Sequence, residues 1–86
     1  MDFEELEREA VSELPNIPIG TVFRVRDLFK NYRWESFSHG DRRDFGKHFK
    51  RQVNNRAISN VEYVGKAQNG SAEYQRIEVD YEADSV

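Results

Sequence analysis

Apolar residues recur at helical spacing near the start of the chain and give way to β-branched runs further on. The first pattern predicts an amphipathic helix over residues 1–14, with Asp2 placed to cap it and Pro15 to end it. The β-branched and aromatic run Thr21–Val25 predicts a short strand. The apolar positions of the first helix are Phe3, Leu6, Ala10, Val11 and Leu14.

A short second helix is predicted over residues 26–32, because Leu28, Phe29 and Tyr32 fall on one side of it. Residues 33–40 follow as a turn, and we expect the two large aromatic side chains in this turn to enter the core.

A longer third helix begins after Ser38 or Asp41, either of which can cap it. We expect Gly46, which lies beside the buried stripe, to let another backbone come close. Asn54 or Asn55 is predicted to end the helix in the left-handed conformation. The buried stripe itself consists of Phe45, Phe49 and Val53.

Two strand-like runs at residues 58–67 and 71–79 are joined through Asn69 and Gly70. This dipeptide is the strongest short hairpin signal, because both residues tolerate the positive φ angles of a type I′ turn. The apolar alternation is imperfect on both strands, so the register stays open.

The predicted order of helix, strand, helix, turn, helix and hairpin is that of a winged helix-turn-helix domain. The fold class expected is therefore α+β, in one domain over residues 1–86. Within it we place a winged-helix core at residues 19–80 and an acidic tail at residues 81–86.

The net charge of −3 hides an uneven distribution of charge. Residues 1–19 hold six acids and one base, and residues 78–86 hold four acids and no base. Six of the thirteen Lys and Arg residues fall within residues 39–56, beside only two acids. A basic middle between acidic ends predicts nucleic acid as the partner, DNA rather than RNA, with the acidic ends facing away from it.

An exposed line of basic and amide side chains is predicted along the third helix. Arg43 can pair with guanine and Asn54 with adenine, whereas the lysines would hold phosphates. The hairpin tip supplies a second contact. The predicted nucleic-acid-binding residues are Arg42, Arg43, Lys47, Lys50, Arg51, Asn54, Arg56, Lys66, Gln68 and Asn69.

Several alternatives stay open. The basic face can be merely solvated, or Tyr63 and Tyr74 can stack the bases of single-stranded DNA instead of packing in the sheet. The acidic first helix can imitate phosphates in a protein-interaction module or phage-type inhibitor, and its apolar stripe can serve the core or the seam of a homodimer.

Catalysis, cofactors and metals are not expected. His39 and His48 lack metal-ligand spacing, and we expect His48 to be an exposed spectator. Cysteine is absent, no apolar run reaches the length of a membrane span, and the acidic N-terminus is unlike a signal peptide. These features predict a cytoplasmic protein.

A longer motif resembles a family of small bacterial and phage domains of unknown function, often labelled single-stranded-DNA-binding. It covers roughly residues 19–77, and the resemblance implies a winged-helix-like fold and association with nucleic acid. Its positions are Phe23-x-Val25-x-Asp27-Leu28-Phe29, Trp34, Arg42 or Arg43, Phe45-Gly46-Lys47-x-Phe49, Val53 and Tyr74.

Overall fold

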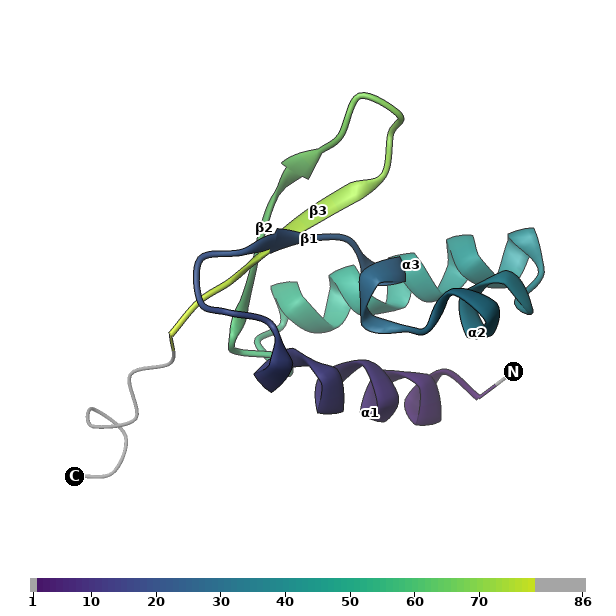
Figure 1. Cartoon of the computed structure of the whole chain (residues 1–86), viewed down its shortest axis with the longest axis horizontal. Coiled ribbons are helices and arrows are strands. Elements are labelled where there is room, and N and C mark those ends of the chain that lie inside the picture. Colours follow the sequence, from purple (N-terminus) through teal and green to yellow (C-terminus); the bar gives the residue numbers. More distant parts are fainter. Residues whose placement is uncertain (1, 79–86) are drawn as a thin grey trace.

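A computed structural model describes residues 2–78, so the predicted acidic tail at residues 81–86 lies outside the described residues. The α+β class is confirmed: residues 2–78 form three α-helices and a three-stranded antiparallel sheet, in an arrangement compatible with a winged-helix-like fold (Figure 1). The elements are α1 (Phe3–Glu13), β1 (Val22–Phe23), α2 (Asn31–Glu35), α3 (His39–Asn54), β2 (Val61–Lys66) and β3 (Ala72–Arg76), with 3₁₀ turns at Leu14–Asn16 and Val25–Leu28. Within this part of the chain, no helix is long and apolar enough to cross a membrane.

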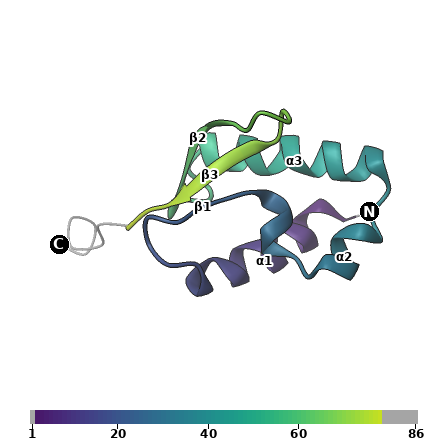
Figure 2. The ribbon, with the colours of Figure 1, turned by 45° about the horizontal axis from the view of Figure 1, so that its top comes forward.

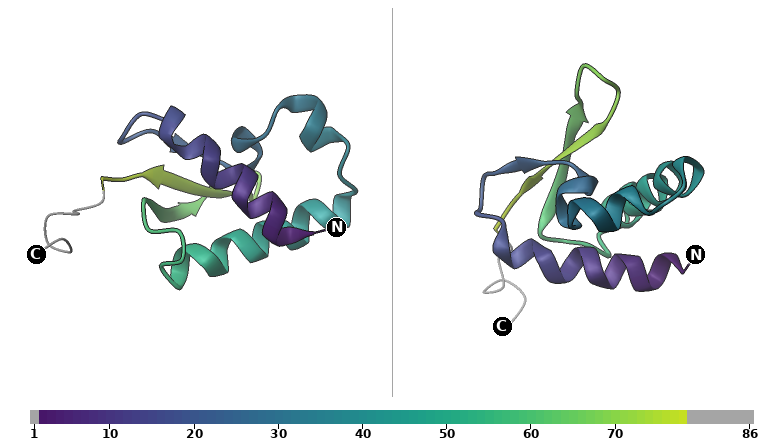
Figure 3. Two further views of the ribbon diagram at one scale, coloured as in Figure 1. Left: turned by 90° about the horizontal axis from the view of Figure 1, so that it is seen from below. Right: turned by 45° about the vertical axis from the view of Figure 1, so that its right-hand side comes forward.

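The strand order is β1-β3-β2, and the β2–β3 hairpin extends well beyond the short first strand (Figure 2). The hairpin and α1 lie on opposite sides of the molecule, with α3 and β1 between them (Figure 3). Aromatic rings fill the centre. Phe45, Phe49 and Tyr74 are fully buried, and the rings of Phe49 and Tyr74 meet edge to face with centroids 5.1 Å apart.

Helix α1 forms as predicted. The Asp2 carboxylate accepts hydrogen bonds from the backbone N–H groups of Glu4 and Glu5, which satisfies donors that the first turn leaves unpaired. Leu6, Ala10 and Leu14 are all buried in the core of this same chain. The apolar stripe therefore serves the core of its own chain, except at Val11, which is 36% exposed.

The prediction between residues 21 and 40 is partly wrong. The first strand has only two residues, because Asp27 accepts a 2.9 Å hydrogen bond from the N–H of Arg24 and the chain turns into a 3₁₀ helix there. Phe29 is extended and buried against the rings of neighbouring aromatics. Helix α2 consequently starts later than predicted, inside the expected turn, and Tyr32 is 72% exposed instead of buried.

Helix α3 begins at the predicted cap, since Ser38 accepts a hydrogen bond from the N–H of Asp41. Its stripe of Phe45, Phe49 and Val53 is buried, as predicted. The prediction for Gly46 is wrong: a Cβ built there would meet no atom within 4 Å among the described residues. This glycine costs the helix about 1 kcal/mol relative to alanine, and no contact among residues 2–78 explains it.

Arg56 ends α3 in the left-handed conformation, with φ of 63°, so the prediction of Asn54 or Asn55 is wrong. The N–H of Arg56 reaches the carbonyl of Val53, and the N–H of Ala57 reaches that of Gln52. These two bonds form a Schellman motif, whose left-handed position most often holds glycine.

The hairpin is confirmed, but its turn differs from the type I′ turn predicted. The N–H of Gly70 bonds to the carbonyl of Ala67, so Gln68 and Asn69 are the central residues, and Gly70 alone in this turn has a positive φ. That is typical of a type I turn followed by a left-handed glycine. On β2 the pairing shifts between Tyr63 and Gly65, a bulge that explains the imperfect alternation.

Replacing Arg56 by glycine should stabilise the fold. A side chain in the left-handed region costs roughly 1 kcal/mol that glycine avoids, so we expect Arg56→Gly to raise the free energy of unfolding by about that amount. Urea denaturation measures it, with Arg56→Ala as the matched control that removes the charge but keeps the strain. An equal gain in both variants would assign the cost to the charge instead.

Replacing Tyr74 by phenylalanine should also stabilise the fold. The Tyr74 hydroxyl is buried without a hydrogen-bond partner among the described residues, and removing such a group gains about 1 kcal/mol. Burial, helped by the nearby Tyr63, raises the pKa of Tyr74 to about 12. The unfolded chain therefore loses this proton first, and wild-type stability falls as the pH rises from about 10 to about 12.

Urea denaturation at pH 7 and pH 11 tests both effects. Tyr74→Phe should be the more stable protein at pH 7, and its advantage over the wild type should widen at pH 11. Tyr32→Phe, at an exposed position, is the control and should change neither value. A loss of stability in Tyr74→Phe at pH 7 would show that the hydroxyl has a partner.

Candidate nucleic-acid interface

One flank of α3 is held against α1 by polar contacts. Nε2 of His48 lies 2.8 Å from Oε1 of Glu7, and Gln52 donates to the other oxygen of the same carboxylate at 3.4 Å. The His48 ring also packs against Phe3 and Phe45. His48 is thus a link between two helices, and the prediction that it is an exposed spectator is wrong.

Arg42 joins the beginning of α3 to the end of α2. Its guanidinium donates to the carbonyl oxygens of Trp34 and Glu35, at 3.2 and 3.1 Å. These carbonyls lie at the carboxyl end of α2, where backbone C=O groups lack hydrogen-bond donors within the helix and the helix dipole favours a cation. Arg42 therefore has donors already engaged within the fold.

The opposite side of α3 carries the predicted line of polar side chains. Arg43, Lys47 and Asn54 of this line are exposed, and so is Arg51, which was predicted beside it. Arg43 pairs with the neighbouring Asp44 at 3.6 Å, but both side chains are more than half exposed, and such pairs contribute little. Among residues 2–78, no carboxylate lies within ion-pair distance of Lys47 or Arg51.

Lys50 connects this line to the sheet. Its ammonium lies 4.3 Å from the centre of the Tyr63 ring on β2, a cation–π contact between helix and hairpin. The Tyr63 ring in turn packs edge to face on Tyr74, with centroids 5.6 Å apart. No pattern along the chain predicts this contact, because helix and strand spacing alone do not place the two elements face to face.

The remaining predicted residues lie apart from this line. Lys66, Gln68 and Asn69 sit at the end of the hairpin, which projects away from the helices (Figure 1). There they border a shallow hollow of about 550 Å³, together with Arg24 and Glu73. The structure therefore presents two basic or polar surfaces, one along α3 and one at the hairpin tip, with exposed Arg56 just beyond the end of α3.

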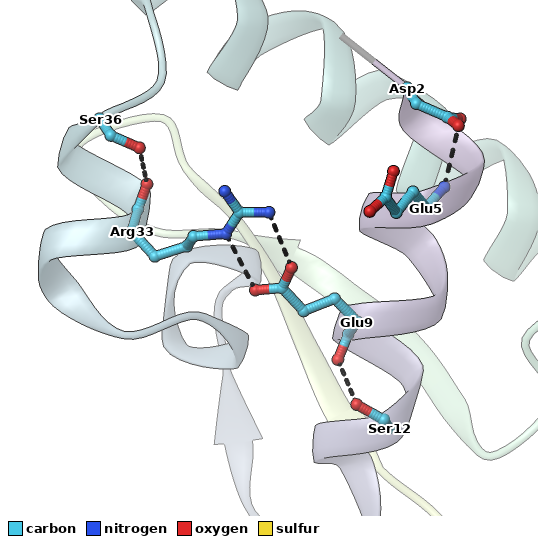
Figure 4. Close-up of polar contacts among 6 residues, drawn as sticks. All are labelled: Asp2, Glu5, Glu9, Ser12, Arg33 and Ser36. Carbon is cyan, nitrogen blue, oxygen red and sulfur yellow. Dashed lines mark hydrogen bonds and ion pairs between the residues drawn. The ribbon is translucent and has the colours of Figure 1, made fainter.

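The acidic first helix is partly engaged within the fold. Glu9 accepts two hydrogen bonds from Arg33 of α2, at 3.0 and 3.3 Å (Figure 4). Hydrogen bonding to Glu9, together with its charge, raises the pKa of Arg33 above its ordinary value. These partners lie 24 residues apart in the sequence and Glu7 lies 41 residues from His48, so no local motif announces either pair.

Comparison with known proteins places the chain in a family. The family model described as "Domain of unknown function (DUF1413)" matches residues 8–76. No curated protein matches the sequence significantly.

A solved structure named "SCCmec type IV LP1413 - nucleic acids binding protein" superimposes with a TM-score of 0.64, covering 91% of this chain and 96% of that one. The two sequences are 23% identical, so the likeness shows a shared fold. Because the family model spans most of the chain, and in agreement with the resemblance seen in its motif, the protein belongs to the DUF1413 family of domains of unknown function.

Proposed function

We propose that this protein is a non-catalytic nucleic-acid-binding protein that presents α3 and the hairpin tip to duplex DNA. The observation that carries the proposal is the outward face of α3. Arg43, Lys47 and Arg51 are exposed there, on a helix whose opposite face is anchored by buried aromatic rings. Cations held in one line on a rigid helix suit a phosphate backbone.

Two further observations support this proposal. The protein of similar fold is named a nucleic-acid-binding protein. The acidic helix α1 lies on the side away from the hairpin (Figure 3), and two of its acids, Glu7 and Glu9, are engaged by His48 and Arg33. The negative charge of α1 is therefore kept away from the side on which the hairpin would meet an anionic partner.

The side chains of α3 favour a duplex over a single strand. The helix has 16 residues, about 24 Å, and a two-turn segment of such a helix fits the major groove. Its two aromatic residues, Phe45 and Phe49, are both buried, whereas single-strand binders need exposed rings for stacking.

The side chains take distinct roles in this proposal. Asn54 faces a base edge, and Arg43, Lys47, Lys50 and Arg51 hold phosphates. Arg42, engaged by α2, positions the helix instead of touching DNA. A second set of side chains contacts the DNA backbone on either side of α3: Arg56, Lys66, Gln68 and Asn69.

Removing two cations from α3 should weaken binding and its dependence on salt. Each phosphate contact contributes about 0.9 to the slope of log affinity against log salt. We expect Lys47→Ala/Lys50→Ala to lower that slope by about 2. Fluorescence anisotropy of labelled duplex DNA, from low to moderate salt, measures it.

The matched control is Arg8→Ala/Lys30→Ala, which removes two exposed cations from α1 and the start of α2. It should leave the slope close to that of the wild type. Equal losses in both double variants would show only a net-charge effect. Absence of binding to duplex and single-stranded DNA at low salt would instead favour a protein partner for the acidic helix.

A single-stranded ligand is the second candidate, and the observation that favours it is the partly exposed ring of Tyr63 beneath Lys50. Loss of a stacked base costs about 1–3 kcal/mol. If bases stack there, Tyr63→Leu should lower single-strand affinity at least about fivefold. With α3 in a duplex, as proposed, the same variant should bind duplex DNA within about twofold of wild type, measured by the same anisotropy titration.

A further inference from the structure

Gly46 has no role in the fold that the structure reveals. It lies in the middle of α3, outside the positive-φ region that requires glycine, and its missing side chain leaves open space. Alanine would favour the helix. The absence of a side chain at this position therefore needs a reason outside the residues that the structure describes.

The position of Gly46 on α3 supplies that reason. Residues three and four apart share a side of a helix, so Gly46 lies on the same side as Arg43 and Lys50. It faces away from His48, which contacts α1. Lys50 extends from this side toward Tyr63 of the hairpin. Gly46 thus leaves the helix backbone uncovered between two cationic side chains, on the side of α3 that faces the sheet.

Arg43 and Lys50 are seven residues apart, about 10 Å along the helix axis. The Arg43 guanidinium lies toward Gly40 and the Lys50 ammonium lies against Tyr63, and both side chains are long enough to turn toward an anion placed between them. A side chain at position 46 would fill that space, and its absence lets a ligand touch the helix backbone.

We propose that the sugar–phosphate backbone of bound nucleic acid passes directly over Gly46, with Arg43 and Lys50 on either side of one phosphate. This inference rests on the proposed function and assigns a steric determinant of binding to a residue without charge. Gly46 is a positioning residue: it sets how closely the backbone approaches the two cations.

Gly46→Ala tests the inference, with Gly40→Ala as the matched control. Gly40 lies in the same helix, and its added Cβ would come no nearer than 4.0 Å to the Arg43 side chain. Gly46→Ala should raise the melting temperature by about 4 °C or more and weaken DNA binding about tenfold. The salt slope should stay unchanged, since no cation is lost. Gly40→Ala should bind like wild type.

The outcomes separate the two proposals. Wild-type affinity in Gly46→Ala overturns this inference while leaving the proposed function intact. A lower melting temperature, or a reduced salt slope, also overturns it, because the glycine would then serve the fold or the placement of the cations. Absence of DNA binding by the wild-type protein removes the proposed function itself, and this inference with it.

Discussion

The burial of two phenylalanine rings from one side of α3 governs the rest of the structure. Phe49 meets Tyr74 of the central strand, and Phe45 meets Phe29 and Phe3 from the two other sides of the core. Removing one such ring from a core costs about 3–5 kcal/mol. The helix therefore cannot rotate about its axis, and this packing turns its cationic side toward solvent.

Polar contacts on the flanks of α3 and α1 complete this arrangement. Glu7 faces His48, Glu9 faces Arg33, and the Arg42 guanidinium covers the end of α2. Each exposed pair adds little stability. Their larger effect is on where charge remains unmatched: Glu7 and Glu9 of α1 have partners within the fold, whereas the outward line of α3 keeps its cations.

Periodicity predicted the elements that bury one continuous face. The spacing of apolar residues predicted helices α1 and α3. The predicted position of α3 then predicted the line of cations on its exposed side. The short segments between them depended on tertiary contacts, so Phe29 became extended and Tyr32 became exposed against expectation. The partners of Glu7 and Lys50 lie on other elements, and only the folded chain brings them together.

At two positions in the α3 region, the residue type is unfavourable for the backbone conformation it adopts. Gly46 occupies a helix interior where a side chain would stabilise, and Arg56 occupies a left-handed position where glycine would. Exchanging these two residue types would suit folding better at both sites. Sequences depart from local consistency chiefly where function requires it, and both departures lie beside the exposed cations of α3. The proposed nucleic-acid partner accounts for both departures, because it needs bare backbone at one position and positive charge at the other.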